Sequence, residues 1–104
     1  IMLPVNNTHT RININEILYV KADGAYALIY EKDAHYFCAK SLKYFEEALP
    51  KEEFFRIHNS FLVRIDAIKA VKMGRDQPAI LNNGAEVPVA RNQRKQLMSL
   101  LNSI

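Results

Sequence analysis

The sequence predicts a mostly β fold, because its apolar residues come in short segments bounded by turn signals. Such segments run through most of the 104 residues, and this pattern is typical of strands. Two of the breaks contain Asp23-Gly24 and Asn83-Gly84, and both dipeptides are strong turn signals. Only two segments space their apolar residues as an amphipathic helix does. We therefore expect many short strands and two helices.

In the first half of the chain, several strands are expected before the first helix. Ile12 and Ile14 alternate with polar residues, which favours a strand there. The further expected strands are residues 17–21 (ILYVK), 26–30 (YALIY) and 36–40 (YFCAK). Residues 31–34 (EKDA) separate the last two, which are predicted to pair as a hairpin.

A short helix is predicted after this hairpin. Ser41 can cap its N-terminus, and Pro50 stops it. The residues on its apolar side are Leu42, Phe45, Ala48 and Leu49. We expect this side to cover a sheet.

Residues 54–65 (FFRIHNSFLVRI) alternate as a strand does, but the alternation has a polar break. Its apolar positions are Phe55, Ile57, Phe61, Val63 and Ile65, and Asn59 interrupts them. Burying that amide without partners would cost about 1–3 kcal/mol. Two interpretations are open. A bulge or turn at residues 58–60 lets the amide bond with backbone, or the break displays the polar triplet to another molecule.

The second half is expected to add three strands and a helix. The strands are residues 67–72, 78–81 and 85–89, the last two paired around Asn82-Asn83-Gly84. In residues 90–104 the apolar residues at helical spacing are Leu97, Leu100, Leu101 and Ile104. Arg91, Arg94 and Lys95 fall near the first turn, where cations oppose the helix dipole. Free amide groups and cations together could bind a phosphate there.

Basic residues are concentrated in the second half of the chain. Residues 1–55 carry six Lys or Arg against eight Asp or Glu, a balance of −2, whereas residues 56–104 carry eight against three, a balance of +5. The pI is about 9.1. This distribution fits polyanion binding and also fits an ordinary solvated basic face.

The chain lacks the patterns of an enzyme or of a metal site. His9, His35 and His58 have no ligand spacing, and three glycines cannot form a nucleotide-binding loop. Ser60 and Asp66 lie near His58, but no nucleophile-elbow pattern accompanies them. We expect no metal, no cofactor and no catalysis.

Length and cysteine usage bound the setting of the protein. One domain over residues 1–104 fits the length, and the opening residues IMLPVNN suggest a cut inside a longer chain. The single Cys38 is expected to pack in a core in a reducing cytoplasm. No signal peptide or membrane span is visible, so we expect a cytoplasmic domain without membrane insertion.

Three segments together resemble the LytTR-type DNA-binding domain of bacterial response regulators. Residues 54–68 (FFRIHNSFLVRIDAI) are similar to its Phe-x-Arg-x-His-x-Ser-[Phe/Tyr]-[Leu/Val]-Val signature. Residues 14–30 (INEILYVKADGAYALIY) and 83–97 (NGAEVPVARNQRKQL) resemble an earlier strand segment and the closing Gly-x-x-[Ile/Val]-Pro-[Val/Ala]-[Ser/Ala]-Arg element. The resemblance covers roughly residues 8–102.

This resemblance implies a fold and a function. The fold would be an elongated arrangement of small antiparallel sheets, with one short helix and a C-terminal helix. Loops would enter the DNA grooves. The function would be sequence-specific binding of double-stranded DNA, as the output domain of a two-component transcriptional regulator. An upstream receiver or sensory domain and a cognate sensor kinase are then expected partners.

The resemblance also implies the residues that touch DNA. Base contacts fall on Asn59, Arg91 and Tyr26, and other family members carry a charged or imidazole side chain where this chain has Tyr26. The residues implied for contacts to the DNA backbone are Arg56, His58, Ser60, Asn92, Arg94 and Lys95. Arg64 is also basic, but Val63 and Ile65 flank it on the opposite strand face, and we expect it to be merely solvated.

Two other classes of function remain open from the residues. An RNA- or single-strand-binding β module would stack bases on exposed aromatic rings, and the candidate rings are Tyr19, Tyr26, Tyr30, Tyr36 and Tyr44. A protein-interaction or ligand-sensing domain would bind no nucleic acid. Because the chain has no heptads, we expect an isolated monomer that occupies direct repeats on DNA.

Overall fold

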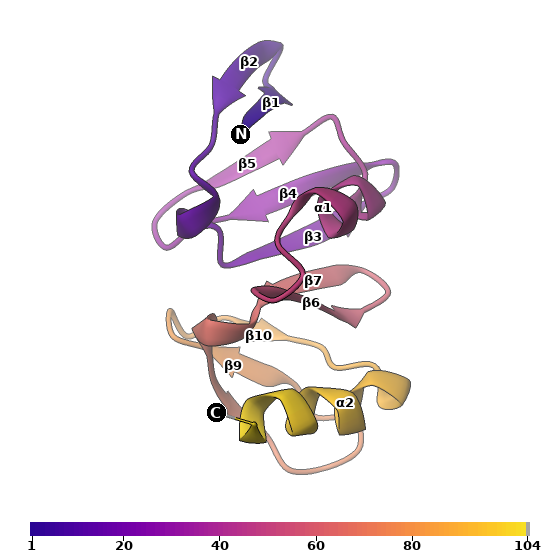
Figure 1. Cartoon of the computed structure of the whole chain (residues 1–104). Helices are drawn as coiled ribbons and strands as arrows, with labels where there is room; N and C mark the ends of the chain where they lie inside the picture. The colour runs from indigo at the N-terminus through magenta and orange to yellow at the C-terminus, as the bar shows by residue number, and fades with distance from the viewer. Residues whose placement is uncertain (104) are drawn as a thin grey trace.

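The computed structural model describes residues 1–103 and shows an elongated, mostly β molecule of 41 × 24 × 22 Å (Figure 1). Its strands are β1 (Met2–Val5), β2 (Thr8–Arg11), β3 (Tyr19–Asp23), β4 (Tyr26–Tyr30), β5 (His35–Cys38), β6 (Phe54–His58), β7 (Phe61–Arg64), β8 (Ile68–Val71), β9 (Ala79–Leu81) and β10 (Glu86–Val87). Its helices are α1 (Leu42–Ala48) and α2 (Arg91–Asn102), with short 3₁₀ helices at Ile14–Glu16 and Ile65–Ala67. The predicted fold class is confirmed.

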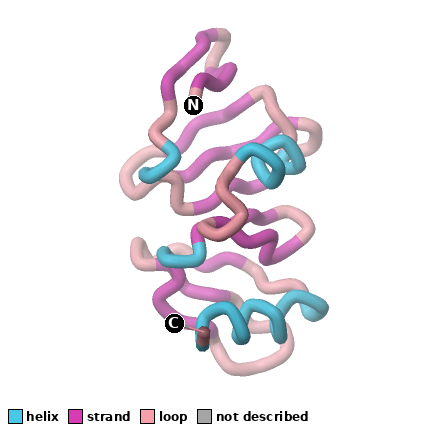
Figure 2. The backbone as a smooth tube through the Cα atoms, viewed as in Figure 1, coloured by secondary structure: helices cyan, strands magenta, loops and turns pink. Residues whose placement is uncertain are grey.

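The strands form two antiparallel sheets. Seven strands have the order β2-β1-β5-β4-β3-β7-β6, and three have the order β10-β9-β8. Figure 2 shows the two α-helices lying against strands at different levels of the long axis. Contacts join α1 to β3, β6 and β7, and α2 to β6. The hairpin of β6 and β7 therefore lies between the two helices.

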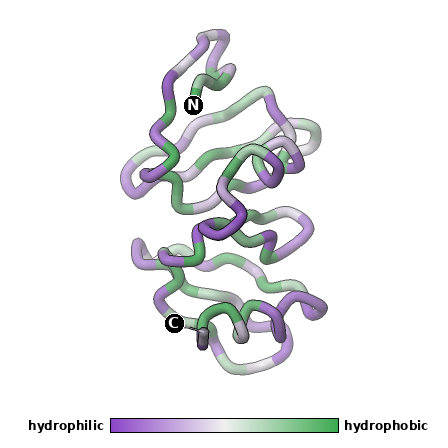
Figure 3. Tube along the Cα trace, viewed as in Figure 1, coloured by the Kyte–Doolittle hydropathy of each residue, from purple (hydrophilic) through white to green (hydrophobic). Residues whose placement is uncertain are grey.

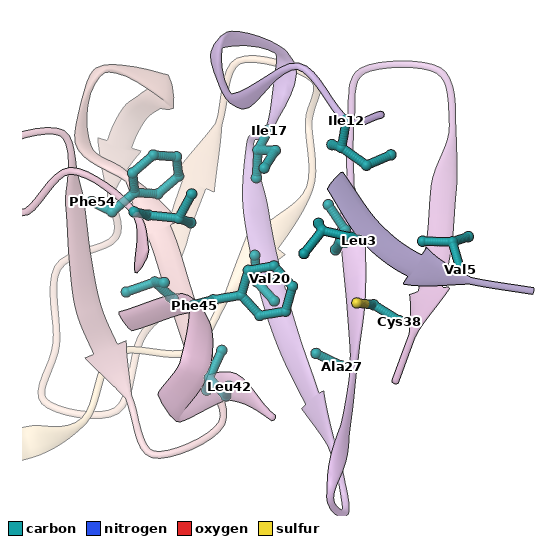
Figure 4. Packing of buried hydrophobic residues seen from close by; sticks show 13 residues of the cluster. Leu3, Val5, Ile12, Ile17, Val20, Ala27, Cys38, Leu42, Phe45 and Phe54 are labelled. Carbon is teal, nitrogen blue, oxygen red and sulfur yellow. The ribbon is translucent and has the colours of Figure 1, made fainter. Parts of the chain in front are cut away.

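Both faces of this hairpin are buried, each in its own core. Phe54 and Leu62 belong to the core beneath α1, and Figure 4 shows Phe54 packed near Phe45 of that helix. Phe55, Ile57 and Val63 belong to the second core, which also contains Leu97 of α2. Successive strand residues point to opposite faces, so the doublet Phe54-Phe55 supplies one ring to each core. Figure 3 shows the corresponding hydrophobic segments along the strands and hydrophilic turns between them.

Residues 54–65 form two strands joined by a tight turn. Phe54 pairs with Arg64 and His58 with Phe61, which leaves Asn59 and Ser60 as the two turn residues. The Asn59 side chain is exposed, so its amide is not in the core. The ladder also shifts between Phe55 and His58. The first interpretation is correct in predicting a turn at residues 58–60. It is wrong in expecting the amide to bond with backbone, because within residues 1–103 the Asn59 side chain makes no hydrogen bond and only its backbone carbonyl accepts one.

The strand expected at Ile12 and Ile14 is wrong. Strand β2 ends at Arg11, and a 3₁₀ helix begins at Ile14. The Asn13 side chain accepts a hydrogen bond from the Asn15 N–H at 3.0 Å, and this local bond turns the chain. Alternation over only two isoleucines was too short to outweigh it.

The opening residues form a hairpin that was not predicted. Strands β1 and β2 pair in full register from Met2↔Arg11 to Val5↔Thr8. The turn residues Asn6 and Asn7 have φ values of 50° and 62°. Asparagine enters this left-handed region more readily than other residues with side chains, and two such residues in succession suit a two-residue hairpin turn.

The remaining elements agree with prediction to within a few residues. Strand β3 begins two positions later than expected, and β5 ends at Cys38 rather than Lys40. Ser41 caps α1 by accepting a hydrogen bond from the Tyr44 N–H at 3.2 Å. Ala48 is exposed, contrary to expectation, because it lies at the edge of the face defined by Leu42, Phe45 and Leu49. The predicted position of Ile104 on the last helix falls outside the described residues.

Arg64 is not solvated as expected, since its side chain is only 12% exposed. Its guanidinium donates to the carbonyl oxygens of Ile14 and Ile17 and to Oε1 of Glu53. It also lies 4.6 Å from the ring centroid of Phe54. Arg64 therefore ties β7 to the segment before β3 and to the end of the α1–β6 connection.

Cys38 lies in the core, as predicted. Its side chain is fully buried, and burial raises the pKa of the Cys38 thiol. The thiol is thus held protonated as a small apolar side chain. Over residues 1–103, no helix has the length and apolar character needed to cross a membrane.

Candidate nucleic-acid interface

Three connections gather on one edge of the molecule, at the right of Figure 1. They are the β3–β4 turn, the β6–β7 turn and the start of α2. Gly24 has φ of +60°, which glycine adopts without steric cost, and it forms the first turn. The Ala22 N–H donates to the Ser60 carbonyl at 2.8 Å, which links the first turn to the second. Strand hydrogen bonds thus set the spacing of these two turns.

The bulge in β6 attaches α2 next to the second turn. Arg56 and Ile57 together oppose Leu62 alone, so the usual alternation of carbonyl directions is interrupted. The Ile57 carbonyl accepts from the Ala90 N–H at 2.9 Å, and the Arg56 carbonyl accepts from Nε2 of Gln93 at 2.8 Å. Both bonds come from the first turn of α2 or the residue before it. Arg91 is therefore held close to the β6–β7 turn.

Arg56 braces the β6–β7 turn from within. Its Nε donates to the His58 carbonyl at 3.1 Å, and its Nη2 donates to the Asn59 carbonyl at 2.6 Å. Its Nη1 pairs with Glu46 of α1 at 2.7 Å. These bonds leave the guanidinium with fewer free donors for a phosphate than a solvated arginine has, and they fix the backbone that carries Asn59.

Of the other side chains in this turn, His58 bonds within the turn and Asn59 is exposed. Nδ1 of His58 accepts a hydrogen bond from the Ser60 N–H at 3.0 Å. The ring proton of neutral His58 therefore lies on Nε2, which remains available as a donor. Within residues 1–103 the Asn59 side-chain amide makes no hydrogen bond, although its backbone carbonyl does. Its donor and acceptor are both free for a ligand.

Arg91 at the start of α2 is paired with an acid from the β8–β9 loop. Its Nε lies 2.7 Å from Oδ1 of Asp76, and its Nη2 lies 3.0 Å from Oδ2. Hydrogen bonding to Arg91 lowers the pKa of the Asp76 carboxyl, and the same contact raises the pKa of Arg91. Both groups are therefore charged at neutral pH.

The other predicted residues of α2 differ in their surroundings. Arg94 donates to the carbonyl oxygens of Gln77, at 2.7 Å, and of Lys72, so it holds the β8–β9 loop against the helix. Asn92 and Lys95 are exposed. Of these three residues, Lys95 is the cation most free to approach a phosphate.

Tyr26 begins β4 directly after the first turn and is 48% exposed. Its ring meets the ring of Phe37 edge to face, with centroids 5.3 Å apart. Phe37 is itself 40% exposed. The pair presents apolar ring surface together with one phenol hydroxyl, which suits contact with a thymine methyl or a single hydrogen bond.

Replacing Tyr26 with phenylalanine is expected to change DNA affinity by less than about tenfold, because a phenol supplies at most one hydrogen bond to a base. Tyr26→Ala should cost more, since it removes the ring contact area as well. Titration of a fluorescent duplex measures both. If Tyr26→Phe lost as much DNA affinity as Asn59→Ala, the prediction that Tyr26 supplies at most one hydrogen bond to a base would be contradicted.

The other tyrosines are half-buried and engaged with neighbours. Tyr19 and Tyr30 stack on each other with centroids 4.4 Å apart. Tyr44 packs edge to face on Phe45, and the Tyr36 hydroxyl donates to Glu31. Rings that already stack within the protein offer little free face to single-stranded bases.

Sequence reasoning missed two residues of this edge. Gln93 fastens α2 to β6, and Asp76 holds Arg91. Asp76 could have been noticed as one of only three acids in the basic second half of the chain. Its partner could not, because fifteen positions separate the two residues.

A β scaffold that presents an amide and a guanidinium on one edge has groups that can pair with nucleic-acid bases. Comparison with protein families agrees, since the family model described as the LytTr DNA-binding domain matches residues 7–102. The chain belongs to this family of DNA-binding domains.

Comparison with individual proteins supports the same family. The chain is similar to the solved LytTr DNA-binding domain of a Bacillus cereus protein, with a TM-score of 0.82, 25% identity, and coverage of 98% of this chain and 95% of that one. It is 27% identical over 101 residues to the sensory transduction protein LytT of Bacillus subtilis, covering 95% of this chain and 42% of LytT. It is 30% identical over 91 residues to the transcriptional regulatory protein YpdB of Escherichia coli K12, covering 85% of this chain and 37% of YpdB. The chain spans about two fifths of the length of LytT and of YpdB.

Proposed function

We propose that this domain reads a specific sequence in double-stranded DNA through the edge formed by the β3–β4 turn, the β6–β7 turn and the start of α2. The observation that carries the proposal is the β6–β7 turn, where Arg56 fixes the backbone while the Asn59 amide stays exposed and unbonded within residues 1–103. An amide can pair with N6 and N7 of adenine, and a guanidinium with O6 and N7 of guanine. Asn59 and Arg91 then read bases, and Tyr26 adds an apolar contact.

Contacts to the DNA backbone would position Asn59, Arg91 and Tyr26 on the duplex without reading sequence. Lys95 and Asn92 are exposed beside Arg91, and His58 and Ser60 flank Asn59. Arg56 and Arg94 would contribute through whatever donors their carbonyl contacts leave free. The main effect of Arg56 and Arg94 is to fix the shape of the loops that carry the other contact residues.

The whole protein is proposed to be a cytoplasmic transcriptional regulator. Support comes from relatives named as a sensory transduction protein and as a transcriptional regulatory protein. Another relative, 28% identical over 103 residues, is the CO-responsive transcriptional regulator RcoM of Rhodospirillum rubrum. An upstream receiver domain with a cognate sensor kinase, or another sensory domain, would supply the signal. No catalytic role is assigned to the domain.

Selection from a pool of random duplexes tests this function. The domain should enrich a defined sequence and bind that duplex more tightly than a scrambled duplex, either separated strand, or RNA of the same sequence. Enrichment of no sequence, with equal or tighter binding to single strands, would favour a single-strand-binding module. Negligible binding to every nucleic acid would favour a protein-interaction domain.

We further infer that the isolated domain is a monomer that occupies direct repeats on one face of the duplex. The longer helix, α2, already packs on the domain's own core, where its Leu97 is fully buried. It is therefore not free to serve as a dimerisation helix. Repeats on one face lie a whole number of helical turns apart, each roughly 34–36 Å. Two copies linked in tandem, which mimic pairing by an upstream domain, should bind such repeats more tightly than a single site.

Inserting half a helical turn between the repeats should remove this gain and leave single-site affinity unchanged, because the second copy would face the opposite side of the duplex. Gel-shift titration measures both quantities. Sedimentation that shows a tight dimer of the isolated domain without DNA, or a preference for inverted repeats, would refute the arrangement.

A further inference from the structure

Asp76 occupies one edge of the Arg91 guanidinium and leaves the other edge open. The two hydrogen bonds to its carboxylate use Nε and one hydrogen of Nη2, at 2.7 and 3.0 Å. Within residues 1–103, Nη1 makes no hydrogen bond. A guanidinium has five donor hydrogens in one plane. The outer pair on Nη1 and Nη2 therefore remains available for a second planar partner while Asp76 stays bound.

The loop that carries Asp76 is braced on both sides of it. Arg94 of α2 donates to the carbonyl oxygens of Lys72 and Gln77. The Lys72 N–H donates to the Pro78 carbonyl at 3.0 Å, which closes the base of the loop. Asp76 lies between these anchors, so its carboxylate has a defined position relative to the first turn of α2. An acid on an unanchored loop would not orient its partner.

We propose that Asp76 is a specificity-determining residue, which orients Arg91 so that the open edge of its guanidinium meets O6 and N7 of one guanine. This inference rests on the proposed function and deepens it. Guanine offers two acceptors in one plane in the major groove, and the open edge offers two coplanar donors. A side chain that is already fixed in plane loses less freedom when the base contact forms. An exposed aspartate is charged at neutral pH, and hydrogen bonding to Arg91 moves the pKa of Asp76 further down.

The charge of Asp76 also lowers the affinity of the domain for DNA of any sequence. A carboxylate near the duplex repels phosphates, and that cost is the same on every sequence. Only the correct guanine offsets it through the oriented contact. Asp76 is thus expected to lower affinity for random DNA while raising the ratio between correct and incorrect sites.

A competing role makes the opposite prediction. If Asp76 only neutralised Arg91 in the free protein, the ion pair would have to break before DNA binds. Removing the acid would then raise affinity for the correct site at least as much as for random DNA. The sign of the change in discrimination separates the two roles.

The test uses Asp76→Asn and a duplex selected with the unaltered domain. Arg91→Ala first locates the guanine, as the G·C pair whose replacement by A·T no longer matters in that variant. We expect Asp76→Asn to reduce discrimination between the G·C and A·T duplexes by at least about fivefold, with unchanged or higher affinity for random duplex. In the Arg91→Ala background, Asp76→Asn should not alter discrimination further.

Two controls complete the experiment. Asp33→Asn makes the same charge change in the β4–β5 turn, away from this edge, and should leave discrimination intact. Thermal melting checks that Asp76→Asn folds, and Asp76→Ser provides a second variant of this exposed position. Retained discrimination with increased affinity for the G·C duplex would overturn the role of Asp76. Failure of the unaltered domain to prefer any duplex would instead overturn the proposed function.

Discussion

Replacing Arg64 with alanine is expected to lower the free energy of unfolding by about 2–4 kcal/mol, since it removes the donor for two carbonyl groups far away in sequence. The side chain is 12% exposed and bonds to the carbonyl oxygens of Ile14 and Ile17 in the segment before β3. Its ion pair with Glu53 adds less, because that carboxylate is 39% exposed and screened by solvent. Urea denaturation followed by circular dichroism measures the loss.

Two further variants show whether geometry or charge is responsible for the effect of Arg64. Arg64→Lys keeps the positive charge but cannot present several donors in one plane, so its stability should fall between that of alanine and arginine. Arg75→Ala makes the same alanine change in the exposed β8–β9 loop and should shift stability by less than about 0.5 kcal/mol. An Arg64→Ala midpoint equal to that of the unaltered domain would contradict the structural role.

Asn59→Ala is expected to weaken binding to the selected duplex by about ten- to a hundredfold, because a bidentate amide contact to adenine is lost. The melting temperature should stay nearly the same, since the exposed amide makes no hydrogen bond within residues 1–103. Affinity for random duplex should change little, because the phosphate contacts remain. Titration and thermal melting on the same samples give all three values.

The matched control for this change is Asn15→Ala, at an exposed asparagine in the 3₁₀ helix before β3. It should leave both the affinity and the melting temperature unchanged. A collapse in the melting temperature of Asn59→Ala, with unchanged affinity of the folded fraction, would show that Asn59 serves the turn instead of DNA.

Much of the fold follows from local patterns. Ser41 and Pro50 bound α1 as predicted, and the turns around Gly24 and Gly84 fall where glycine takes positive φ. These signals act within a few residues, through capping bonds and allowed backbone angles, so a single sequence can reveal them. The Asn6-Asn7 turn was equally local and could have been recognised by the same chemistry.

The candidate site was also predicted partly from local patterns, and partly from the resemblance to a family. The break at residues 58–60 predicted a turn from the cost of burying Asn59, and the structure places that turn on the same edge as Arg91. The roles of Asn59, Arg91 and Tyr26 as base contacts stay predictions. The resemblance to LytTR domains supplied those roles, whereas the alternation of residues supplied only the turn.

By itself, the sequence predicted the strand and helix segments of the second half, a break at residues 58–60 and a resemblance to the family. Only the tertiary structure decided which cations are free. The sequence placed Arg56 and Arg94 at the DNA backbone and Arg64 in solvent, yet each donates to carbonyl oxygens, while Lys95 stays exposed. Composition records the charge of a side chain, but its acceptors come from strands and loops that chain folding brings together. A guanidinium has several donors and can bond to any acceptors that packing brings near it. The partners of each arginine were therefore fixed by packing.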